Sequence, residues 1–416
     1  MELNRIKFTK GNGGMGRTAA SEDPISGLIF AGMGLTFGDI TETTPDNIAG
    51  FDDLEVATDD TWVSAAKKFE YVEQLADAGI VWTEYDEDTT LTAIQKAKNT
   101  LYYHVSEFFR MNPEGTLYLM IKTQTTAVVA NDVKLLQNYA DGKIRQCGIF
   151  NVDFGTTLKA DALQTALTEL EEDYKPLSCV VTYSGNTLAL NTLTANQLKT
   201  AGQCNVSVLI GCDYTTDLSN NLGNYAFYGC IGACIGAISK ASVHECIAWV
   251  QKFPLGFTSP ALFNGNLIKN VSKANKEQLN DNYIFVITHV GDADCYFNDS
   301  HTLDETTSDY AYIENVRTID KATRGIRTNL LPYLASPLKV DATTGKLDSG
   351  TVAFLETTAG KALEDMEKAG ELSGYTAEID PNQNVLSTST VEIVIKQVGV
   401  GVMRKVNVKI GFATSL

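Results

Sequence analysis

The sequence has 416 residues, of which 44% are hydrophobic and 20% are charged, a composition that excludes a disordered or fibrous chain. At about 150 residues per domain, this length favours two to three domains. The formal net charge of -18 argues against a broad nucleic-acid-binding surface, because the phosphates would be repelled.

Charge is distributed unevenly along the chain. Residues 1–17 and residues 391–416 each carry a net charge of +3, which leaves -24 for residues 18–390. In one interpretation, the lysines of the two ends lie at sheet edges and do no more than block aggregation. Alternatively, two basic ends can dock on the acidic surfaces of other copies. Composition alone does not decide between these interpretations.

A short strand is predicted near the start of the chain, where Ile6 and Phe8 share one face. A glycine-rich stretch follows it, formed by Gly11, Gly13, Gly14 and Gly16. The glycine spacing formally matches a dinucleotide-binding loop, but that loop requires a helix directly after it. Residues 17–24 are polar and contain a proline, so we interpret the glycines as a flexible joint.

Helices and strands alternate through the middle of the chain. Residues 39–60 hold eight acidic residues and no basic one, which predicts a solvated loop region. After it, apolar spacing predicts helices over 61–75, 91–109, 132–140, 160–174 and 227–250. It predicts strands over 80–82, 116–121, 146–150, 177–183, 205–211 and 282–288. This alternation favours an α/β layer with a mostly parallel sheet, and glycines 229, 232 and 236 predict close packing of the last helix.

The pattern changes after residue 289. Helices are predicted over 310–334, with a basic stripe that includes Arg317, Lys321, Arg324 and Arg327, and over 351–369. Segments 391–398 and 402–412 flank Gly399-Val400-Gly401 and predict a terminal hairpin. One face of its second strand is apolar and must be buried against something: Val406, Val408, Ile410 and Phe412.

Few residues are candidates for catalysis or metal binding. His289 and His301 lie near four aspartates in residues 288–305, but the spacing fits no recurrent metal site, and a solvated acidic loop is the preferred interpretation. Cys230 and Cys234 are one helical turn apart, which is typical of buried small side chains. No common catalytic motif is present. We therefore predict no catalytic, cofactor-binding or metal-binding residue.

Nothing in the sequence predicts insertion into a membrane. The N-terminus has no apolar signal-peptide region, and the apolar core of the longest uncharged stretch, residues 226–238, is too short to cross a bilayer. A soluble protein is expected.

The C-terminal third resembles the contractile tail sheath proteins of bacteriophages and related injection particles. The resemblance rests on residues 291–302, 308–321, 330–334, 369–374, 381–384 and 398–402, taken in this order. Residues 6–11 and 25–29 also resemble the start of sheath proteins from phages and prophages. Residues 40–280 match only in general α/β character.

The resemblance implies a fold with four parts. These are an N-terminal linking arm (1–20), an α/β outer domain (21–280), a conserved α+β sheath core (281–390) and a C-terminal linking hairpin or arm (391–416). The outer domain of such proteins is an inserted α/β domain of subtilisin-like topology, and both arms are extended β segments. We find no segment resembling a subtilisin-type serine nucleophile, so the likeness in fold implies no protease activity.

The resemblance also implies a function. Such a subunit polymerises as stacked hexameric rings around an inner tube, and contraction drives the tube through a target envelope. Its partners would be further copies of itself, the tail tube protein, and baseplate and tail terminator proteins. Its location would be a virion tail or phage-tail-like particle assembled in the bacterial cytoplasm. The alternative is an α/β enzyme, a hydrolase or nucleotide-using protein, with a β appendage.

Three groups of residues receive a role from this reading. Inter-subunit contacts are assigned to Ile6, Phe8, Val406, Val408, Ile410 and Phe412, and an arm hinge to Gly11, Gly13, Gly14 and Gly16. Contact with the tube is assigned to Arg317, Lys321 and Arg324. The alternative for this last group is a stripe paired with acidic residues of its own chain.

Overall fold

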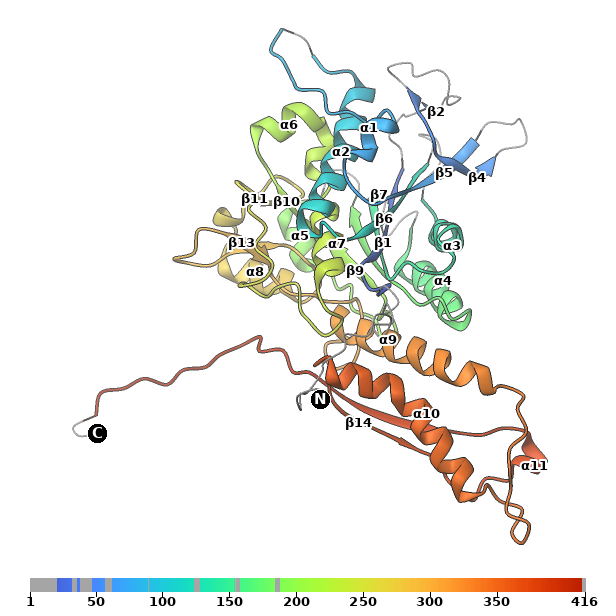
Figure 1. Cartoon of the computed structure of the whole chain (residues 1–416). Coiled ribbons are helices and arrows are strands. Elements are labelled where there is room, and N and C mark those ends of the chain that lie inside the picture. Colours follow the sequence, from blue (N-terminus) through green and yellow to red (C-terminus); the bar gives the residue numbers. More distant parts are fainter. Residues whose placement is uncertain are drawn as a thin grey trace, which may run out of the picture.

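A seven-stranded sheet forms the centre of the molecule. The computed structural model describes residues 21–31, 36–37, 47–56, 62–88, 90–122, 128–152, 154, 158–183 and 188–413. The strand order is β4 (Asp52–Val56), β5 (Trp62–Phe69), β6 (Thr116–Lys122), β1 (Ile25–Phe30), β7 (Gln146–Val152), β8 (Ser178–Tyr183) and β9 (Val206–Leu209) (Figure 1). The strands from β6 to β9 are parallel, whereas β5 and β4 extend the sheet antiparallel. The mostly parallel sheet predicted from the sequence is confirmed.

Helices cover both faces of the sheet. One face carries α2 (Ala93–Met111) and α7 (Ile231–Lys240), and the other carries α3 (Ala130–Tyr139) and α4 (Ala160–Glu172). Successive side chains of a strand point to opposite faces. In β1, Leu28 and Phe30 accordingly enter the first core and Ile29 the second. These elements and their cores form what we call the α/β body.

Helix α2 begins and packs for reasons that are visible in its residues. The Thr92 side chain accepts a hydrogen bond from the Gln95 amide, and the Gln95 side chain accepts one from the Thr92 amide, which caps the helix. Helix α7 lies against it through glycines: a Cβ on Gly232 would stand 1.9 Å from the His104 carbonyl oxygen. The close packing predicted for this helix is confirmed.

Smaller elements complete the α/β body. The helical ones are α1 (Gln74–Asp77), α5 (Leu190–Ala195), α6 (Thr216–Leu222), η1 (Gly223–Phe227), η2 (Ile268–Asn270) and α8 (Lys273–Asn280). The short strands pair as β2 (Thr36–Phe37) with β3 (Asn47–Ile48), β10 (Gly211–Asp213) with β11 (Pro260–Leu262), and β12 (Val286–Thr288) with β13 (Cys295–Phe297).

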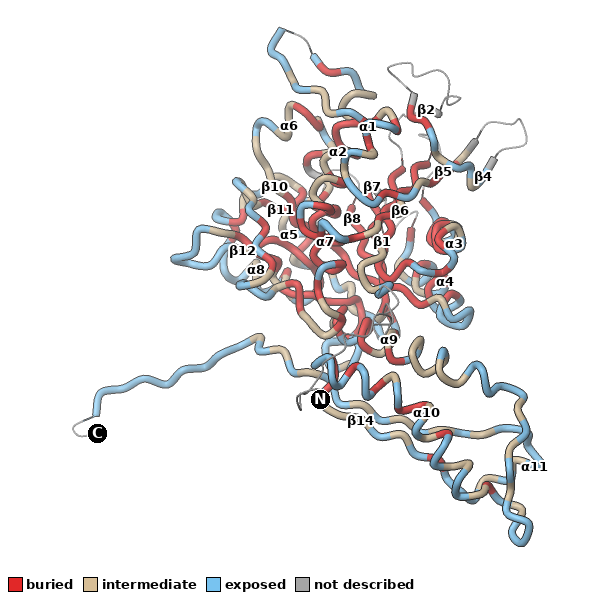
Figure 2. The backbone as a smooth tube through the Cα atoms, viewed as in Figure 1, coloured by how far each residue is buried: buried red, intermediate tan, exposed pale blue. Residues whose placement is uncertain are grey.

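A second, smaller unit follows the α/β body. It consists of α9 (Ile313–Leu330), η3 (Leu331–Tyr333), α10 (Ser349–Lys368), β14 (Leu372–Glu378), α11 (Val385–Thr388) and β15 (Val394–Gly399). Helices α9 and α10 pack side by side, and β14 and β15 pair antiparallel (Figure 1). Its apolar clusters are small, one of them includes Val243 of the α/β body, and Figure 2 shows a larger share of exposed residues here than in that body. We call residues 313–399 the C-terminal unit.

The C-terminal segment, residues 400–413, leaves this unit as an extended chain. It contains neither helix nor strand, and its far part projects away from the rest of the molecule (Figures 1 and 2). The predicted terminal hairpin is therefore wrong: β15 pairs with β14, in the register Leu372↔Gly399, and not with residues 402–412. The error arose because the apolar segments on either side of Gly399-Val400-Gly401 look like a local hairpin, whereas the partner strand of β15 lies earlier in the chain, in β14.

Four other predictions need correction. Residues 62–69 form strand β5 instead of a helix, because they are hydrogen-bonded between β4 and β6 and bury Ser64, Ala65 and Ala66. The predicted strand at 80–82 has no sheet partner. Helix α7 ends at Lys240 because Ala241 adopts an extended backbone conformation. In the region expected to be a solvated loop, β4 joins the sheet and Ile48 is buried.

The boundary between the two large parts differs from the predicted one at 280/281. Residues up to 303 belong to the cores of the α/β body, because Ile284, Phe297 and Leu303 are buried there. The C-terminal unit begins with α9 at Ile313. The connection between them is therefore short and lies around residues 304–312.

The described part of the chain has no single helix that is long and apolar enough to cross a membrane. A bent pair of segments, 216–226 and Ile231–Lys240, passes a test of length and composition. Residues 231–239 of this pair are buried inside the α/β body.

Candidate assembly surfaces

The first described residues are fixed to helix α9 by charge. The Asp23 carboxylate lies 2.7 Å from Nζ of Lys321 and 3.2 Å from a guanidinium nitrogen of Arg324. Burial raises the pKa of Asp23, but Lys321, Arg317 and Arg324 outweigh it and hold this pKa below its usual value. The carboxylate is therefore charged at neutral pH, and the start of the α/β body is tied to the C-terminal unit.

Lys321 connects three parts of the chain. Its Nζ also lies 2.6 Å from Glu371, between α10 and β14, so one ammonium group joins α9, the residues before β1 and the segment before β14. Arg317 is buried and donates to the carbonyl oxygens of Ala241 and Ser242. Next along the helix, the Arg327 guanidinium stacks on the Tyr174 ring at 4.0 Å.

This arrangement corrects the tube-facing role predicted for Arg317, because its guanidinium is buried and hydrogen-bonded inside the chain. Lys321 and Arg324 are likewise paired with Asp23 and Glu371. Lys321 and Arg324 thus follow the alternative that the sequence left open, in which the stripe pairs with acidic residues of its own chain. The acidic partner of Arg324 lies 301 positions away in the chain. The sequence around the stripe therefore does not show that its charges are paired.

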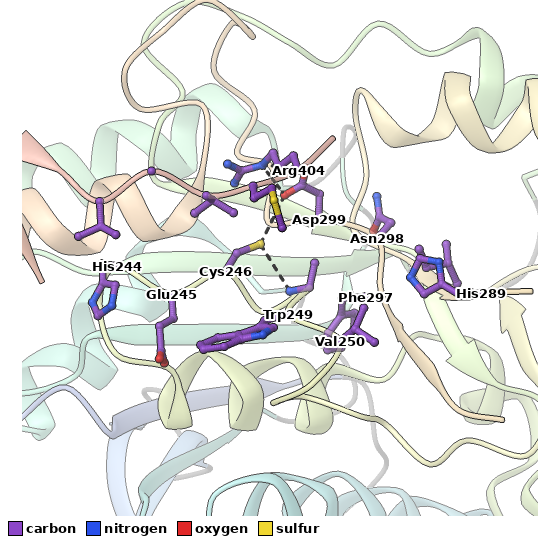
Figure 3. A pocket seen from close by; sticks show the side chains of 16 residues that line it. His244, Glu245, Cys246, Trp249, Val250, His289, Phe297, Asn298, Asp299 and Arg404 are labelled. Carbon is purple, nitrogen blue, oxygen red and sulfur yellow. Dashed lines mark hydrogen bonds and ion pairs between the residues drawn. The ribbon is translucent and has the colours of Figure 1, made fainter. Parts of the chain in front are cut away.

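The C-terminal segment is fixed to the molecule through Arg404. Its Nε lies 3.0 and 3.1 Å from the two Asp299 carboxylate oxygens (Figure 3). Its Nη2 donates to Glu314. The guanidinium carbon also lies 3.5 Å from the centre of the Tyr312 ring. Burial alone lowers the pKa of Arg404, but the charges of Glu314 and Asp299 reverse the direction and raise it.

A cavity of about 600 Å³ lies beside this ion pair. It is lined by the loop after α7, by strands β12 and β13, and by residues 400–404. His244 and His289 stand at opposite ends, with Trp249 between them along the wall (Figure 3). Residues 400–404, where the C-terminal segment begins, thus form one wall of the cavity.

The charged groups of this cavity are occupied in ion pairs and do not form a nucleophile with a base. Glu245 pairs with Lys252, and Asp299 pairs with Arg404. Burial raises the pKa of the Cys246 thiol to about 12, so the thiol is protonated at neutral pH and is a poor nucleophile. Among the described residues, no group of three or more His, Cys, Asp or Glu is placed to hold a metal ion.

Beyond Arg404, the C-terminal segment exposes its apolar side chains. Val406, Val408, Ile410 and Phe412 have relative exposures of 64%, 78%, 95% and 111%. They alternate with Asn407, Lys409 and Gly411, so an extended strand would place them on one face. Nothing in the described part of the chain covers this face. The sequence identified these four residues, but it did not identify Arg404 as their anchor.

The other predicted assembly residues lie outside the described part of the chain. These are Ile6, Phe8, Gly11, Gly13, Gly14 and Gly16. Their roles stay predictions.

Solved structures share this fold along the whole chain. The sheath complex of an extracellular contractile injection system (PVC), in its contracted state, has a TM-score of 0.58 at 12% identity and covers 100% of this chain and 98% of its own. The baseplate of the anti-feeding prophage (AFP), six-fold symmetrised, has a TM-score of 0.56 at 15% identity and full coverage of both chains. The contracted helical sheath of the same prophage has a TM-score of 0.55 at 15% identity, with 98% and 100% coverage. The chain therefore has the fold of contractile sheath proteins.

Sequence comparison places the chain in a family. Residues 3–301 match the DUF2586 N-terminal domain and residues 309–416 match the DUF2586 C-terminal domain, so the chain belongs to the DUF2586 family. The gap between the two matches falls in the short connection before α9. A comparison with curated protein sequences gives no match.

Proposed function

We propose that this chain is the structural subunit of a contractile tail sheath. The observation that carries the proposal is the agreement in fold along 98–100% of the chain with proteins from two contracted sheaths and one baseplate. In this role the chain polymerises as stacked hexameric rings around an inner tube. Contraction of the polymer then drives the tube through a target envelope.

The C-terminal segment links neighbouring subunits in this proposal. Its four exposed apolar side chains gain stability only when another chain covers them, and burying each contributes roughly 1.5–3 kcal/mol. Adding the segment as a strand to a neighbouring sheet would also satisfy its backbone groups. The N-terminal segment, with Ile6 and Phe8 beyond the glycine joint, is proposed to make the corresponding link at the other end.

Contraction requires two alternative packings of the same subunits. In the extended sheath, the subunits form a metastable lattice, and a trigger at the baseplate lets them rotate outward into a tighter one. The linking segments keep neighbours connected while the α/β bodies move. The further partners in this proposal are the tail tube protein and the baseplate and tail terminator proteins. Its location is a phage tail or phage-tail-like particle assembled in the bacterial cytoplasm.

The enzyme alternative has less support. An enzyme of this size needs a pocket in which titratable groups converge on one reacting atom. The cavity of about 600 Å³ instead has its carboxylates paired with Lys252 and Arg404. The full-length likeness to sheath structures fits a structural role better.

Electron microscopy of the purified chain tests the proposal, with and without a co-produced tube protein. We expect long, hollow, transversely striated cylinders. A variant that lacks residues 405–416 should keep the melting temperature of the parent but form no cylinders, because the described residues of this stretch, 405–413, are all exposed. A small oligomer of uniform size from the intact chain would contradict the proposal.

A further inference from the structure

Helix α9 binds one residue near each end of the described chain, Arg404 and Asp23. Glu314, in its first turn, receives Arg404 of the C-terminal segment. Lys321 and Arg324, further along the same helix, receive Asp23 near the start of the described chain. Seven residues separate Glu314 from Lys321, which is about 10 Å along a helix axis. The two segments therefore start from points that one rigid element keeps at a fixed separation.

The site that receives Arg404 is built for a guanidinium group. Asp299 and Glu314 are both buried, and the Tyr312 ring supplies an aromatic face at 3.5 Å. The Ser300 hydroxyl donates to the second Glu314 oxygen at 2.5 Å, which orients that carboxylate. Two carboxylates and a ring match the planar, many-donor shape of arginine better than the point charge of lysine. Without Arg404, two buried carboxylates would lose their principal cation.

Arg404 also marks the point where the C-terminal segment stops contacting the rest of the chain and becomes exposed. Among the described residues of 400–413, it is the only one with an ion pair or side-chain hydrogen bond to the α/β body. Residues 400–403 line the cavity, whereas every described residue from 405 onward is exposed. The nine described residues beyond Arg404 can span about 30 Å when fully extended.

We propose that Arg404 is a positioning residue: seated on Asp299 and Glu314, it fixes the point on helix α9 from which the linking part of the C-terminal segment departs. The role of Arg404 in assembly rests on the proposed function. Its binding to Asp299 and Glu314 is a property of the single chain. A fixed departure point restricts where residues 405–413 can reach. It thereby selects which neighbouring surface they meet and keeps that choice constant while subunits move.

Trypsin tests the seating on the full-length, unpolymerised chain. The protease must take an arginine or lysine side chain into its own pocket, so a seated Arg404 resists cleavage after residue 404. Lys409, exposed in the same segment, is the internal reference. Mass spectrometry of early products should show cleavage after Arg404 at least tenfold slower than after Lys409. Equal rates in the unaltered chain would overturn the proposal without the need for any variant.

Variants identify the groups responsible. In the Asp299→Asn/Glu314→Gln double variant, the ratio of the two rates should rise at least fivefold, because the guanidinium loses both charged partners. The Lys321→Met variant, which disrupts the other anchor on the same helix, should leave the ratio unchanged. If Lys321→Met raises the ratio equally, general loosening of α9 explains the result and the proposal fails.

Assembly then tests the consequence separately. In the Arg404→Met variant we expect cylinders to be absent or irregular, and Arg404→Lys to restore them partly because lysine keeps the charge but not the two-carboxylate fit. Normal cylinders from Arg404→Met would overturn the positioning role even if the trypsin result holds. Failure of the intact chain to form cylinders would contradict the proposed function instead. The ratio of trypsin cleavage after Arg404 and after Lys409 would still test whether Arg404 is bound to Asp299 and Glu314.

Discussion

Gly232 of helix α7 packs directly against the backbone of His104 in helix α2, and a Cβ on Gly232 would lie 1.9 Å from the His104 carbonyl oxygen. The contact leaves no space for a side chain at Gly232. Burial also lowers the pKa of His104 to about 3, so its imidazole is neutral in this apolar layer. The two helices can therefore form one apolar layer over the sheet.

The Gly232→Ala variant should lose about 1–3 kcal/mol of unfolding free energy or more, because the added methyl group forces the two helices apart. Urea unfolding measures this loss. Gly374→Ala is the matched control, since a Cβ there meets nothing within 4 Å, and it should change stability by less than about 0.5 kcal/mol. Equal effects of both substitutions would show that the helix contact is not as close as described.

Lys321→Met should destabilise the isolated chain. The substitution leaves Asp23 and Glu371 without the ammonium group that lies 2.7 and 2.6 Å from them, and we expect a loss of about 1–3 kcal/mol. Lys368→Met is the control, because that residue pairs with Glu364 on an exposed helix surface, where a pair contributes less than about 1 kcal/mol. If Lys321→Met leaves the unfolding free energy unchanged, its ion pairs do not join the two parts of the molecule.

Asp320 predicts a pH dependence of stability. Burial raises its pKa from 3.8 to about 7, although Arg324, Arg145 and Arg317 oppose the shift. Between pH 4 and 7 the unfolded chain has released a proton that the folded chain still holds, so stability falls as pH rises through this window and levels off above it. The contribution is up to about 4 kcal/mol, from roughly three pKa units.

The Asp320→Asn variant lacks this proton and should show a flatter profile. It should exceed the parent in stability at pH 8 and approach it near pH 4. Urea unfolding at several pH values between 4 and 8 measures both curves. Parallel curves would mean that Asp320 titrates at its ordinary value.

Exposed apolar residues of the C-terminal segment should affect assembly but not folding. Ile410→Ser removes an apolar side chain that is 95% exposed, so the melting temperature of the single chain should stay within about one degree. Cylinder formation should fall sharply, because the same side chain is buried in the proposed contact between subunits. Asn407→Ser, on the opposite face of the segment, should alter neither property. A lower melting temperature in Ile410→Ser would place this residue in the core of its own chain.

Regular local signals explain what the sequence predicted well. The helices α2, α3, α4, α9 and α10 have apolar residues at helical spacing, and two of them have an N-terminal capping side chain, Thr92 of α2 and Asp348 of α10. Buried strands such as β6 and β8 are short apolar runs between turns. These features depend on neighbouring residues and are therefore visible in the sequence.

Long-range pairing explains what the sequence could not show. Strand β5 is fixed by hydrogen bonds to β4 and β6, and its residues have no strong strand preference of their own. Strand β15 pairs with β14, which packs against α10, and local turn signals did not indicate this partner. Arg404 finds Asp299 and Glu314 about 100 positions earlier in the chain, and no spacing pattern announces such a site.

Helical reconstruction of assembled particles by electron cryomicroscopy tests the central claim most directly. If the chain is a sheath subunit, the map will show a hollow cylinder of stacked six-membered rings, in which residues 405–413 of each chain contact a neighbouring copy. The α/β body and the C-terminal unit will keep their internal folds. A closed oligomer without a lumen, or a map in which residues 405–413 fold back onto their own chain, would contradict the account.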